Sequence, residues 1–443
     1  MASVRVVNPP VGAQAIPANG RVIGNRWLRN LVTFLMVLGP GLIVMEADND
    51  AGAVSTYVQA GAQYGTTLLW TLLILLPITY FVQEMVARLG VATGKGHAAM
   101  IYKRFGKWWG LFSMIDLQIV NFFTLVTEFA AISLATSKMG FPPQVTVPLF
   151  AFGLVAVVVS GSYLRWERTI VTLCLLDVVW FALAGRVGFP AGEAVRNTLI
   201  PLAARGGWTT DAVFLTVAIV GTTIAPWQLF FQQSCVADKR LRFADLKWAR
   251  LDTFLGACLT ILVGGAMMLV GNAALVHGIK FDDPAQIATA LFKLNGSFVR
   301  NGILLLMCNA AVLGTTAVSL SSAWAYGEVR GWPHSLQLPF RKARGFYSIY
   351  ILAVAGAAAI VLIPNAPLQL IIISVQVLAG LILPSAIIFL QLLLNDRALL
   401  GDQFVNRPWN NWINWTAIVI LLVLSLLLAA QVALPQLFPG ATQ

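Results

Sequence analysis

Long apolar segments recur along the whole chain, and they decide what it can fold into. A run of more than about 18 apolar residues is typical of a transmembrane helix. Only 11% of the 443 residues are charged, whereas soluble proteins carry about 25%. The apolar residues are continuous and do not alternate with polar ones, which excludes a membrane β-barrel. We therefore predict an all-α polytopic membrane protein.

Eleven such segments can be marked, which gives eleven predicted transmembrane helices. Their approximate ranges are 37–64, 66–90, 109–136, 144–160, 167–187, 210–236, 250–276, 299–328, 346–363, 368–394 and 412–433. Residues 1–30 are polar and lack the apolar core of a signal peptide, so they are predicted to be a disordered cytoplasmic tail. Residues 31–200 and 201–400 hold five segments each, and residues 401–443 hold the eleventh.

The excess of positive charge has two possible meanings. A formal net charge of +11 suits nucleic acid or another anionic partner, but membrane proteins also collect Lys and Arg in cytoplasmic loops. With the N-terminus placed in the cytoplasm, 22 of the 29 Lys and Arg residues fall on the cytoplasmic side and 7 on the other. This asymmetry predicts a cytoplasmic N-terminus, an extracytoplasmic C-terminus and no nucleic-acid partner.

Two of the segments are interrupted by residues that a lipid-facing helix avoids. The first contains Glu46, Asp48, Asn49 and Asp50 within its apolar run, and the sixth contains Pro226. Proline has no N–H to donate and breaks or kinks a helix. The two interruptions lie five segments apart, as in an inverted five-plus-five repeat, and such paired broken helices mark the mid-membrane site of a transporter. We therefore predict broken first and sixth helices that share a substrate site.

The residues at these interruptions point to a metal cation as substrate. A carboxylate in hydrocarbon costs about 2.5–3.5 kcal/mol, and neighbouring carboxylates repel one another, so a cation, a proton or water is needed. An unwound helix adds free backbone carbonyls. Carboxylate, carbonyl and amide oxygens together suit Mg²⁺, Ca²⁺ or Mn²⁺. The apolar segments carry no nucleophile–base pair and no metal-binding His cluster, so an enzyme is not expected.

Three short motifs resemble those of the NRAMP transition-metal transporters. In that family, "GP" followed by "DPGN" forms the first half of the metal site; here residues 39–41 read GPG and residues 50–53 read DAGA. The sixth segment of the family reads "MPHN", and residues 225–228 read APWQ. A Gln eight residues before a Pro in the tenth segment is matched by Gln376 and Pro384.

Several residues differ from the NRAMP pattern, and these differences point to one branch of the family. The family's Asn is Ala53, its thioether Met is Ala225, and its two sixth-segment histidines are Trp227 and Gln232. This pattern is similar to the NRAMP-related magnesium transporters, a bacterial branch with the same fold and a different ion. The resemblance implies the amino acid–polyamine–organocation (LeuT-type) fold, a bacterial plasma membrane and metal uptake by alternating access.

The missing thioether also favours a magnesium transporter for a physical reason. Methionine sulfur favours soft metals and adds little for a hard one, and Ala53 and Ala225 both leave extra volume. Mg²⁺ sheds water reluctantly and is held by one or two carboxylates, so a larger oxygen-lined cavity suits it. We predict hydrated Mg²⁺ as the main substrate, with Mn²⁺ also carried and no resident cofactor.

Six residues are predicted to line the metal site, with Asp50 as the main charged ligand. The set is Asp50, Ala53, Thr222, Thr223, Ala225 and Gln376. Thr222 offers a backbone carbonyl at the break, Thr223 a hydroxyl and Gln376 an amide, while Ala53 and Ala225 leave volume. Secondary or vestibule candidates are Glu46, Asp48, Asn49, Glu128 and Gln228.

Proton coupling is not expected. Glu128 aligns with a Glu of the NRAMP third helix, which lines a proton route in that family, but the next two acidic positions of that route are Ala135 and Lys138. Glu128 then remains a truncated relay, a cavity carboxylate or a neutral hydrogen-bonded group.

Other transporter classes fit the sequence less well. The main alternative is a proton-coupled Mn²⁺/Fe²⁺ importer of the usual NRAMP type, which the missing Met and His residues disfavour. A sodium-coupled amino-acid carrier of the same fold would have its substrate carboxylate repelled by the acids of the first segment, and no selectivity-filter motif indicates a channel. The expected partners are the divalent ion and the lipid bilayer, without an obligate protein partner.

Overall fold

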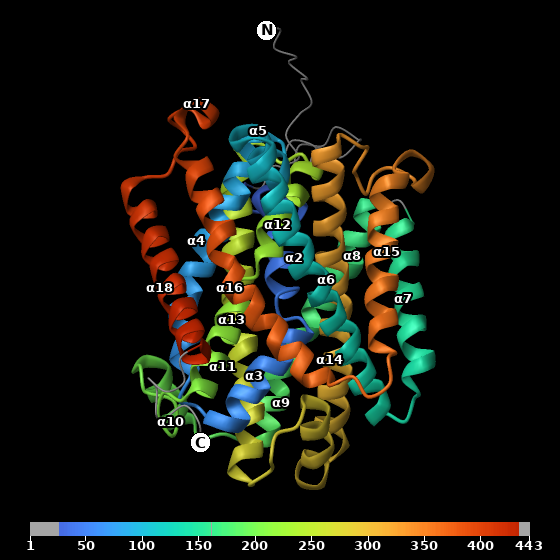
Figure 1. The fold of residues 1–443 in the computed structure, drawn as a ribbon, viewed down its shortest axis with the longest axis vertical. Coiled ribbons are helices and arrows are strands. Elements are labelled where there is room, and N and C mark those ends of the chain that lie inside the picture. The colour runs from blue at the N-terminus through green and yellow to red at the C-terminus, as the bar shows by residue number, and fades with distance from the viewer. Residues whose placement is uncertain (1–25, 161, 434–443) are drawn as a thin grey trace.

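The computed structural model describes residues 26–160 and 162–433, and their regular secondary structure is entirely helical (Figure 1). The first ten α-helices are α1 (Arg26–Val37), α2 (Pro40–Glu46), α3 (Ala51–Tyr64), α4 (Leu69–Thr93), α5 (His97–Phe105), α6 (Lys107–Lys138), α7 (Pro143–Val159), α8 (Tyr163–Cys174), α9 (Val179–Val187) and α10 (Ala191–Leu199). The remaining ones are α11 (Thr210–Thr223), α12 (Pro226–Asp238), α13 (Leu246–Val276), α14 (Pro284–Arg330), α15 (Arg344–Val361), α16 (Leu368–Leu394), α17 (Arg397–Leu400) and α18 (Pro408–Ala433).

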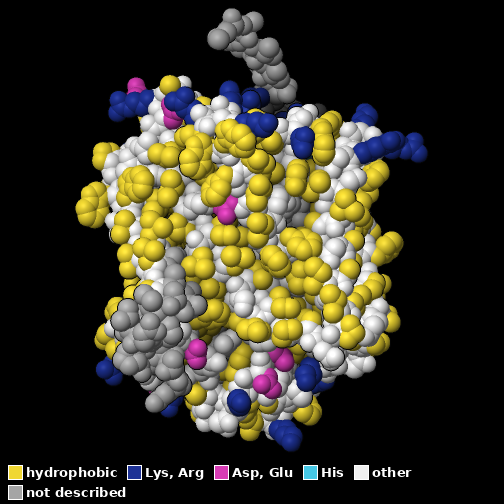
Figure 2. Space-filling model, in the orientation of Figure 1, with side chains coloured by type: hydrophobic (Ala, Val, Ile, Leu, Met, Phe, Trp, Pro, Cys, Tyr) yellow, Lys and Arg dark blue, Asp and Glu magenta, His cyan; other side chains and the backbone are white. Residues whose placement is uncertain are grey.

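Most of the long helices are suited to a bilayer. In the described part of the chain, eight helical segments are long and apolar enough to cross a membrane, and α7 is a shorter apolar helix. Figure 2 shows hydrophobic side chains over the middle of one face, with Lys and Arg gathered near its two ends. This distribution is expected of a protein whose middle faces hydrocarbon and whose ends face water.

The two predicted helix breaks are both confirmed. The first apolar segment divides into α2 and α3, and the sixth divides into α11 and α12, which begins at Pro226. Proline at the first position of α12 is favourable because its missing N–H would have no intrahelical partner there.

Some helix boundaries differ from the sequence prediction. The eighth segment begins at Pro284, 15 residues before the predicted start at 299, and contains a non-helical residue at Gly296 (φ 81°). The helix α1 begins at Arg26, within the range predicted as a disordered tail, while residues 1–25 lie outside the described residues. The additional short helix α10 has Glu193 in its first turn and exposed Val195 and Leu199.

The broken helices lie inside the bundle. Helix α13 packs against both α2 and α3, α11 against α16, and α14 against α6. Glycines allow the closest of these approaches: a Cβ built at Gly61 would lie 1.9 Å from the Met268 carbonyl oxygen, and one at Gly271 would lie 2.1 Å from that of Val58. Small residues at helix contacts are the usual way for membrane helices to approach closely, and here they fix α13 against α3.

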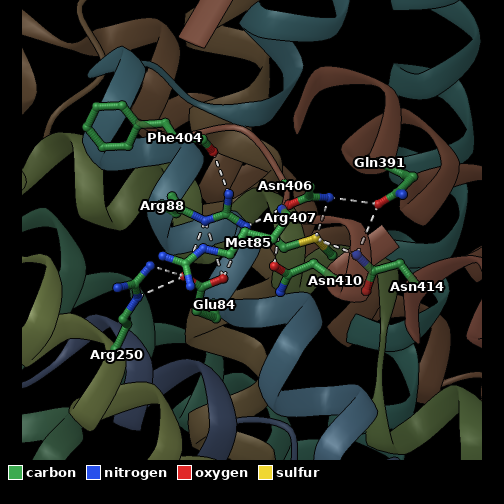
Figure 3. A network of polar contacts seen from close by, with 10 residues as sticks. All are labelled: Glu84, Met85, Arg88, Arg250, Gln391, Phe404, Asn406, Arg407, Asn410 and Asn414. Carbon is green, nitrogen blue, oxygen red and sulfur yellow. Dashed lines mark hydrogen bonds and ion pairs between the residues drawn. The ribbon is translucent and has the colours of Figure 1, made fainter. Parts of the chain in front are cut away.

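A polar network ties four helices together at the end of the bundle where α5 lies (Figure 3). Glu84 of α4 accepts from Arg88 of the same helix and from Arg250 of α13. Arg88 also donates to the Phe404 carbonyl and, at 2.7 Å, to the Asn406 side chain in the connection before α18. The Asn406 amide in turn donates to Gln391 Oε1 of α16 at 3.0 Å. Asn414 of α18 donates to the same oxygen at 3.0 Å and to Met85 Sδ at 2.8 Å.

We expect Arg88→Met to destabilise the fold far more than Arg250→Met. Both arginines pair with Glu84, but the Arg88 side chain is 6% exposed and that of Arg250 is 46% exposed. Breaking a buried pair costs about 3–5 kcal/mol, whereas an exposed pair contributes about 0–1 kcal/mol. Thermal unfolding of the two purified variants in one detergent tests this, and equal losses would contradict the role given to Arg88.

Candidate metal site

Asp50 marks the break in the first apolar segment. Residues 47–50 separate α2 from α3, and Asp50 has an extended conformation (φ −66°, ψ −176°) as the N-cap of α3. Its Oδ1 atom accepts a hydrogen bond of 2.9 Å from the Ala53 N–H, which satisfies one of the free donors at the start of a helix. The predicted main ligand is therefore a capping carboxylate with one oxygen held by backbone.

Glu128 lies at the same helix start. Its Oε2 atom, on α6, accepts from the Ala51 N–H at 3.1 Å, while its Oε1 atom is buried without a hydrogen-bond partner. Gly314 of α14 makes room for both acids: a Cβ built there would lie 2.7 Å from the Glu128 carboxylate carbon and 2.8 Å from Asp50 Cβ. The structure thus brings Glu128 beside Asp50, and the positive end of the α3 dipole favours the pair.

Gln376 reaches the site from α16. A Cβ built at Gly52 would lie 1.7 Å from Gln376 Nε2 and 3.1 Å from Asp50 Oδ1. The amide of Gln376 is therefore close to Asp50, and its Nε2 atom is buried without a hydrogen-bond partner. Gly52 is required here because no side chain fits between the two groups.

The second break supplies backbone oxygens. Ile224 and Ala225 interrupt the helix, and Ala225 is the N-cap of α12. The carbonyl of Thr222 has Pro226 four residues later, and because proline has no N–H, this carbonyl is left free for another partner. The hydroxyl of Thr222 is also buried without a partner.

Thr223, the predicted hydroxyl ligand, also forms contacts within the protein. Its hydroxyl donates to the Ile219 carbonyl at 2.5 Å and forms a 2.7 Å hydrogen bond with the hydroxyl of Tyr57 on α3. These contacts link α11 to α3, and the Thr223 hydroxyl proton is donated to the Ile219 carbonyl.

Four further polar residues fill the space around the breaks. Both carboxylate oxygens of Asp48 are buried without a hydrogen-bond partner, as are Asn49 Oδ1 and Gln228 Nε2. The oxygen of the Gln228 amide accepts from Gln83 Nε2 at 2.7 Å. Glu46 instead faces α13, where its Oε1 accepts from the Thr260 hydroxyl at 3.0 Å. Buried polar atoms normally find partners, so this concentration of free ones indicates a place for water or a cation.

The acids of the first segment do not converge on one point. In the described parts of the chain, no three His, Cys, Asp or Glu side chains form a group able to hold a metal ion. The arrangement at the breaks is instead one carboxylate, Asp50, among neutral oxygen donors, with Glu128 alongside. Sequence reasoning missed Gly314, Tyr57 and Thr260, since no motif distinguishes a small or hydroxyl residue in one apolar helix from those in the others.

The site is closed to solvent in this structure. The exposed fractions are 3% for Asp50, 1% for Thr222, 4% for Ala225 and 2% for Gln376. On the side of α2, the Asp252 carboxylate accepts from the Gly41 N–H at 2.7 Å and from the Leu42 N–H at 3.0 Å.

Further contacts join α2 and α12 to the helices around them. Lys239 pairs with Glu167 at 2.6 Å and donates to the Leu38 carbonyl at 2.9 Å. The ring of Phe231 lies 6.0 Å from that of Trp227 and 5.6 Å from that of Trp324. These contacts tie the start of α2 to the end of α12 and to α8.

Comparison with known proteins gives a consistent result. Residues 41–431 match the family described as natural resistance-associated macrophage protein-like, Nramp. The chain is 25% identical over 435 residues to the "Divalent metal cation transporter MntH" of Staphylococcus aureus strains RF122 and Newman. Each alignment covers 91% of this chain and 92% of the relative.

Solved structures show the same fold. An Eremococcus coleocola manganese transporter superposes with a TM-score of 0.76 at 19% identity, over 93% of this chain and 89% of that one. The amino-acid complex of MhsT with L-phenylalanine superposes with a TM-score of 0.55 at 13% identity, over 88% and 97% of the chains. Because the family match covers nearly the whole described bundle, this chain belongs to the natural resistance-associated macrophage protein (Nramp) family of divalent metal transporters.

Proposed function

We propose that the protein takes up divalent metal cations by alternating access, carries chiefly hydrated Mg²⁺ and also Mn²⁺, and does so without protons. The single observation that supports the proposal is the set of buried polar groups at the two breaks. Asp50, the Thr222 carbonyl and the Gln376 amide provide one charge and neutral oxygens, and Ala225 stands where the resembling family has a thioether, so there is no sulfur among them. The metal is the substrate, and no resident cofactor or enzymatic activity is part of the proposal.

The size and hardness of this set favour Mg²⁺. Mg²⁺ keeps several waters and uses one or two carboxylates, and the free polar atoms of Asp48, Asn49 and Gln228 are suited to bind such waters. Ala53 is fully buried and Ala225 is 4% exposed, and both side chains are smaller than the amide and the thioether that the resembling family carries at these positions. The waters then lie between the ion and the wall of the site.

We also propose the topology that the sequence predicts. The eight apolar spans, α7, the α2–α3 pair and α18 together give eleven transmembrane segments in a bacterial plasma membrane. The end that carries α5 is then cytoplasmic, with the N-terminus on that side and the C-terminus outside. The two five-segment halves, 31–200 and 201–400, form the inverted repeat, and the transporter acts as a single chain.

The proposed absence of proton coupling rests on the residues at two positions and on the hydrogen bonding of Glu128. Trp227 and Gln232 occupy the positions at which the resembling family has histidines. The Glu128 carboxylate is held by the Ala51 N–H, a donor that the proline of the family motif lacks. His97 lies outside the membrane-spanning helices, and its burial lowers the pKa of the ring to about 4, so it is neutral at physiological pH.

The membrane potential can then drive uptake. A divalent cation gains about 4.6 kcal/mol at 100 mV, since each charge gains about 2.3 kcal/mol. At about 1.4 kcal/mol per factor of ten, this supports roughly a 2,000-fold concentration ratio.

We expect Mg²⁺ or Mn²⁺ entry to leave the pH inside vesicles unchanged. Vesicles containing the purified protein and a pH-sensitive dye receive metal under an inside-negative potential, while a metal-sensitive dye in a parallel sample records uptake. A protonophore added at the end provides the positive control for the pH dye. Acidification that depends on metal and disappears in Glu128→Gln would instead support a proton-coupled Mn²⁺/Fe²⁺ importer, the alternative favoured by the manganese-transporter relatives.

A further inference from the structure

A groove separate from the metal site opens between α5, α6 and α14. It has a volume of about 670 Å³, and its wall includes Tyr102 of α5, Leu111 and Ile115 of α6, and Tyr326 and Arg330 of α14. The groove lies at the end of the bundle that carries α5, where Lys and Arg side chains gather on the visible face (Figures 1 and 2).

One end of the groove is basic. Lys107 and Arg330 both line it and are both exposed, and neither forms an ion pair with any residue in the described ranges 26–160 and 162–433. Trp108 and Trp109 lie next to Lys107 and are 78% and 56% exposed. Exposed tryptophans beside basic residues are typical of the headgroup level of a membrane. The unpaired side chains of Lys107 and Arg330 are therefore at the level expected for lipid phosphates.

The rest of the groove wall on α6 is apolar. Leu111, Ile115 and Ile119 all line it, are 44%, 51% and 45% exposed, and follow one another at intervals of four residues, so they lie on one face of the helix. At 1.5 Å per residue, the distance from Lys107 to Ile119 is about 18 Å, close to half of the roughly 30 Å hydrocarbon thickness of a bilayer. This apolar face therefore runs from the headgroup level to the middle of the membrane.

We propose that this groove binds one anionic phospholipid, with its phosphate between Lys107 and Arg330 and an acyl chain along the apolar face of α6. The charge pattern favours a headgroup with a net negative charge, because basic side chains at the membrane surface are attracted to anionic lipid. A free phosphate would use the basic end alone and leave the apolar face unexplained.

The groove is connected to the transport site through its own helices. α6 carries Glu128 and α14 carries Gly314, the residues that lie against Asp50, and the two helices pack along each other. A lipid bound in the groove spans this contact at its surface, so it is placed to stabilise the closed arrangement of α6 and α14.

Native mass spectrometry of the full chain in detergent tests the proposal. The probes are phosphatidylglycerol, phosphatidylcholine of the same acyl chains, and inorganic phosphate. We expect phosphatidylglycerol to bind at least tenfold more tightly than phosphatidylcholine and to resist displacement by phosphate. Lys107→Gln with Arg330→Gln should weaken this binding about 30-fold, or about 2 kcal/mol, the attraction expected of two basic side chains at an anionic surface.

The matched control is Arg341→Gln with Lys342→Gln, which removes two exposed charges from the connection between α14 and α15. We expect it to keep the phosphatidylglycerol affinity. Ile115→Trp, which fills the apolar part without changing charge, should weaken binding of the lipid and leave phosphate binding unaltered. The proposal is overturned if both double variants lose affinity equally, if Ile115→Trp binds phosphatidylglycerol as the wild type does, or if phosphate alone displaces the lipid.

Discussion

Asp50→Asn is expected to lower metal uptake at least 100-fold while the protein stays folded. Asn retains the size of the side chain and remains one of the best N-cap residues, so the hydrogen bond from the Ala53 N–H and the start of α3 are preserved. The negative charge is lost from a site whose other predicted ligands are neutral. Removing one member of a buried charge pair costs about 3–5 kcal/mol, and 3 kcal/mol is a factor of more than about 100.

The measurement is tracer or dye-detected Mg²⁺ uptake into vesicles, with gel filtration and thermal unfolding as checks on folding. Asp116→Asn is a matched control because Asp116 is also a carboxylate within a membrane helix, held by the Ser385 hydroxyl at 2.6 Å and remote in sequence from both breaks. It should transport within about twofold of the wild type, since exposed or singly bonded groups away from a site have small effects. Near-normal uptake by Asp50→Asn would remove Asp50 from the site.

The helix breaks were predictable because their residues are unfavourable within a continuous transmembrane helix. An Asp–Asn–Asp run and a proline within apolar segments are incompatible with a continuous helix in lipid, and both positions break in the structure. The start of the eighth segment was not predictable in the same way. Residues 284–298 include Lys293 and the kink at Gly296, so their hydropathy does not distinguish a helix at the membrane surface from a loop.

Side-chain partners within the site were less predictable than the breaks. Glu46 lies one helical turn before Asp50 in the sequence, yet it turns to Thr260 because α13 packs directly against α2. The Thr223 hydroxyl is a predicted ligand, and its hydrogen bond with Tyr57 of α3 was not predictable from the sequence. Such choices depend on which helices pack together, and helices with all-apolar faces give no pattern that fixes their neighbours.

The second large effect concerns the choice of metal. Ala53→Asn combined with Ala225→Met should lower the preference for Mg²⁺ over Cd²⁺ or Mn²⁺ about tenfold, equivalent to about 1.4 kcal/mol. The Met places a thioether at the start of α12, and thioethers favour softer metals. The Asn adds an amide at a fully buried position and reduces the space for the waters that Mg²⁺ retains. Overpacking a buried site costs about 1–3 kcal/mol, so the variant should remain folded with reduced stability.

A second double variant separates sulfur from volume. Ala53→Asn with Ala225→Leu fills nearly the same space without a sulfur ligand, and Leu and Met exchange readily in packed sites. Competition uptake of Mg²⁺ against Cd²⁺ in vesicles is compared for both. If sulfur decides, only the Met variant gains Cd²⁺ uptake; if volume decides, both variants lose Mg²⁺ uptake equally without a gain in Cd²⁺. A Met variant that keeps the wild-type Mg²⁺ preference would show that neither Ala53 nor Ala225 sets selectivity, and the discrimination would then have to lie in the outer groups Asp48, Asn49 and Gln228.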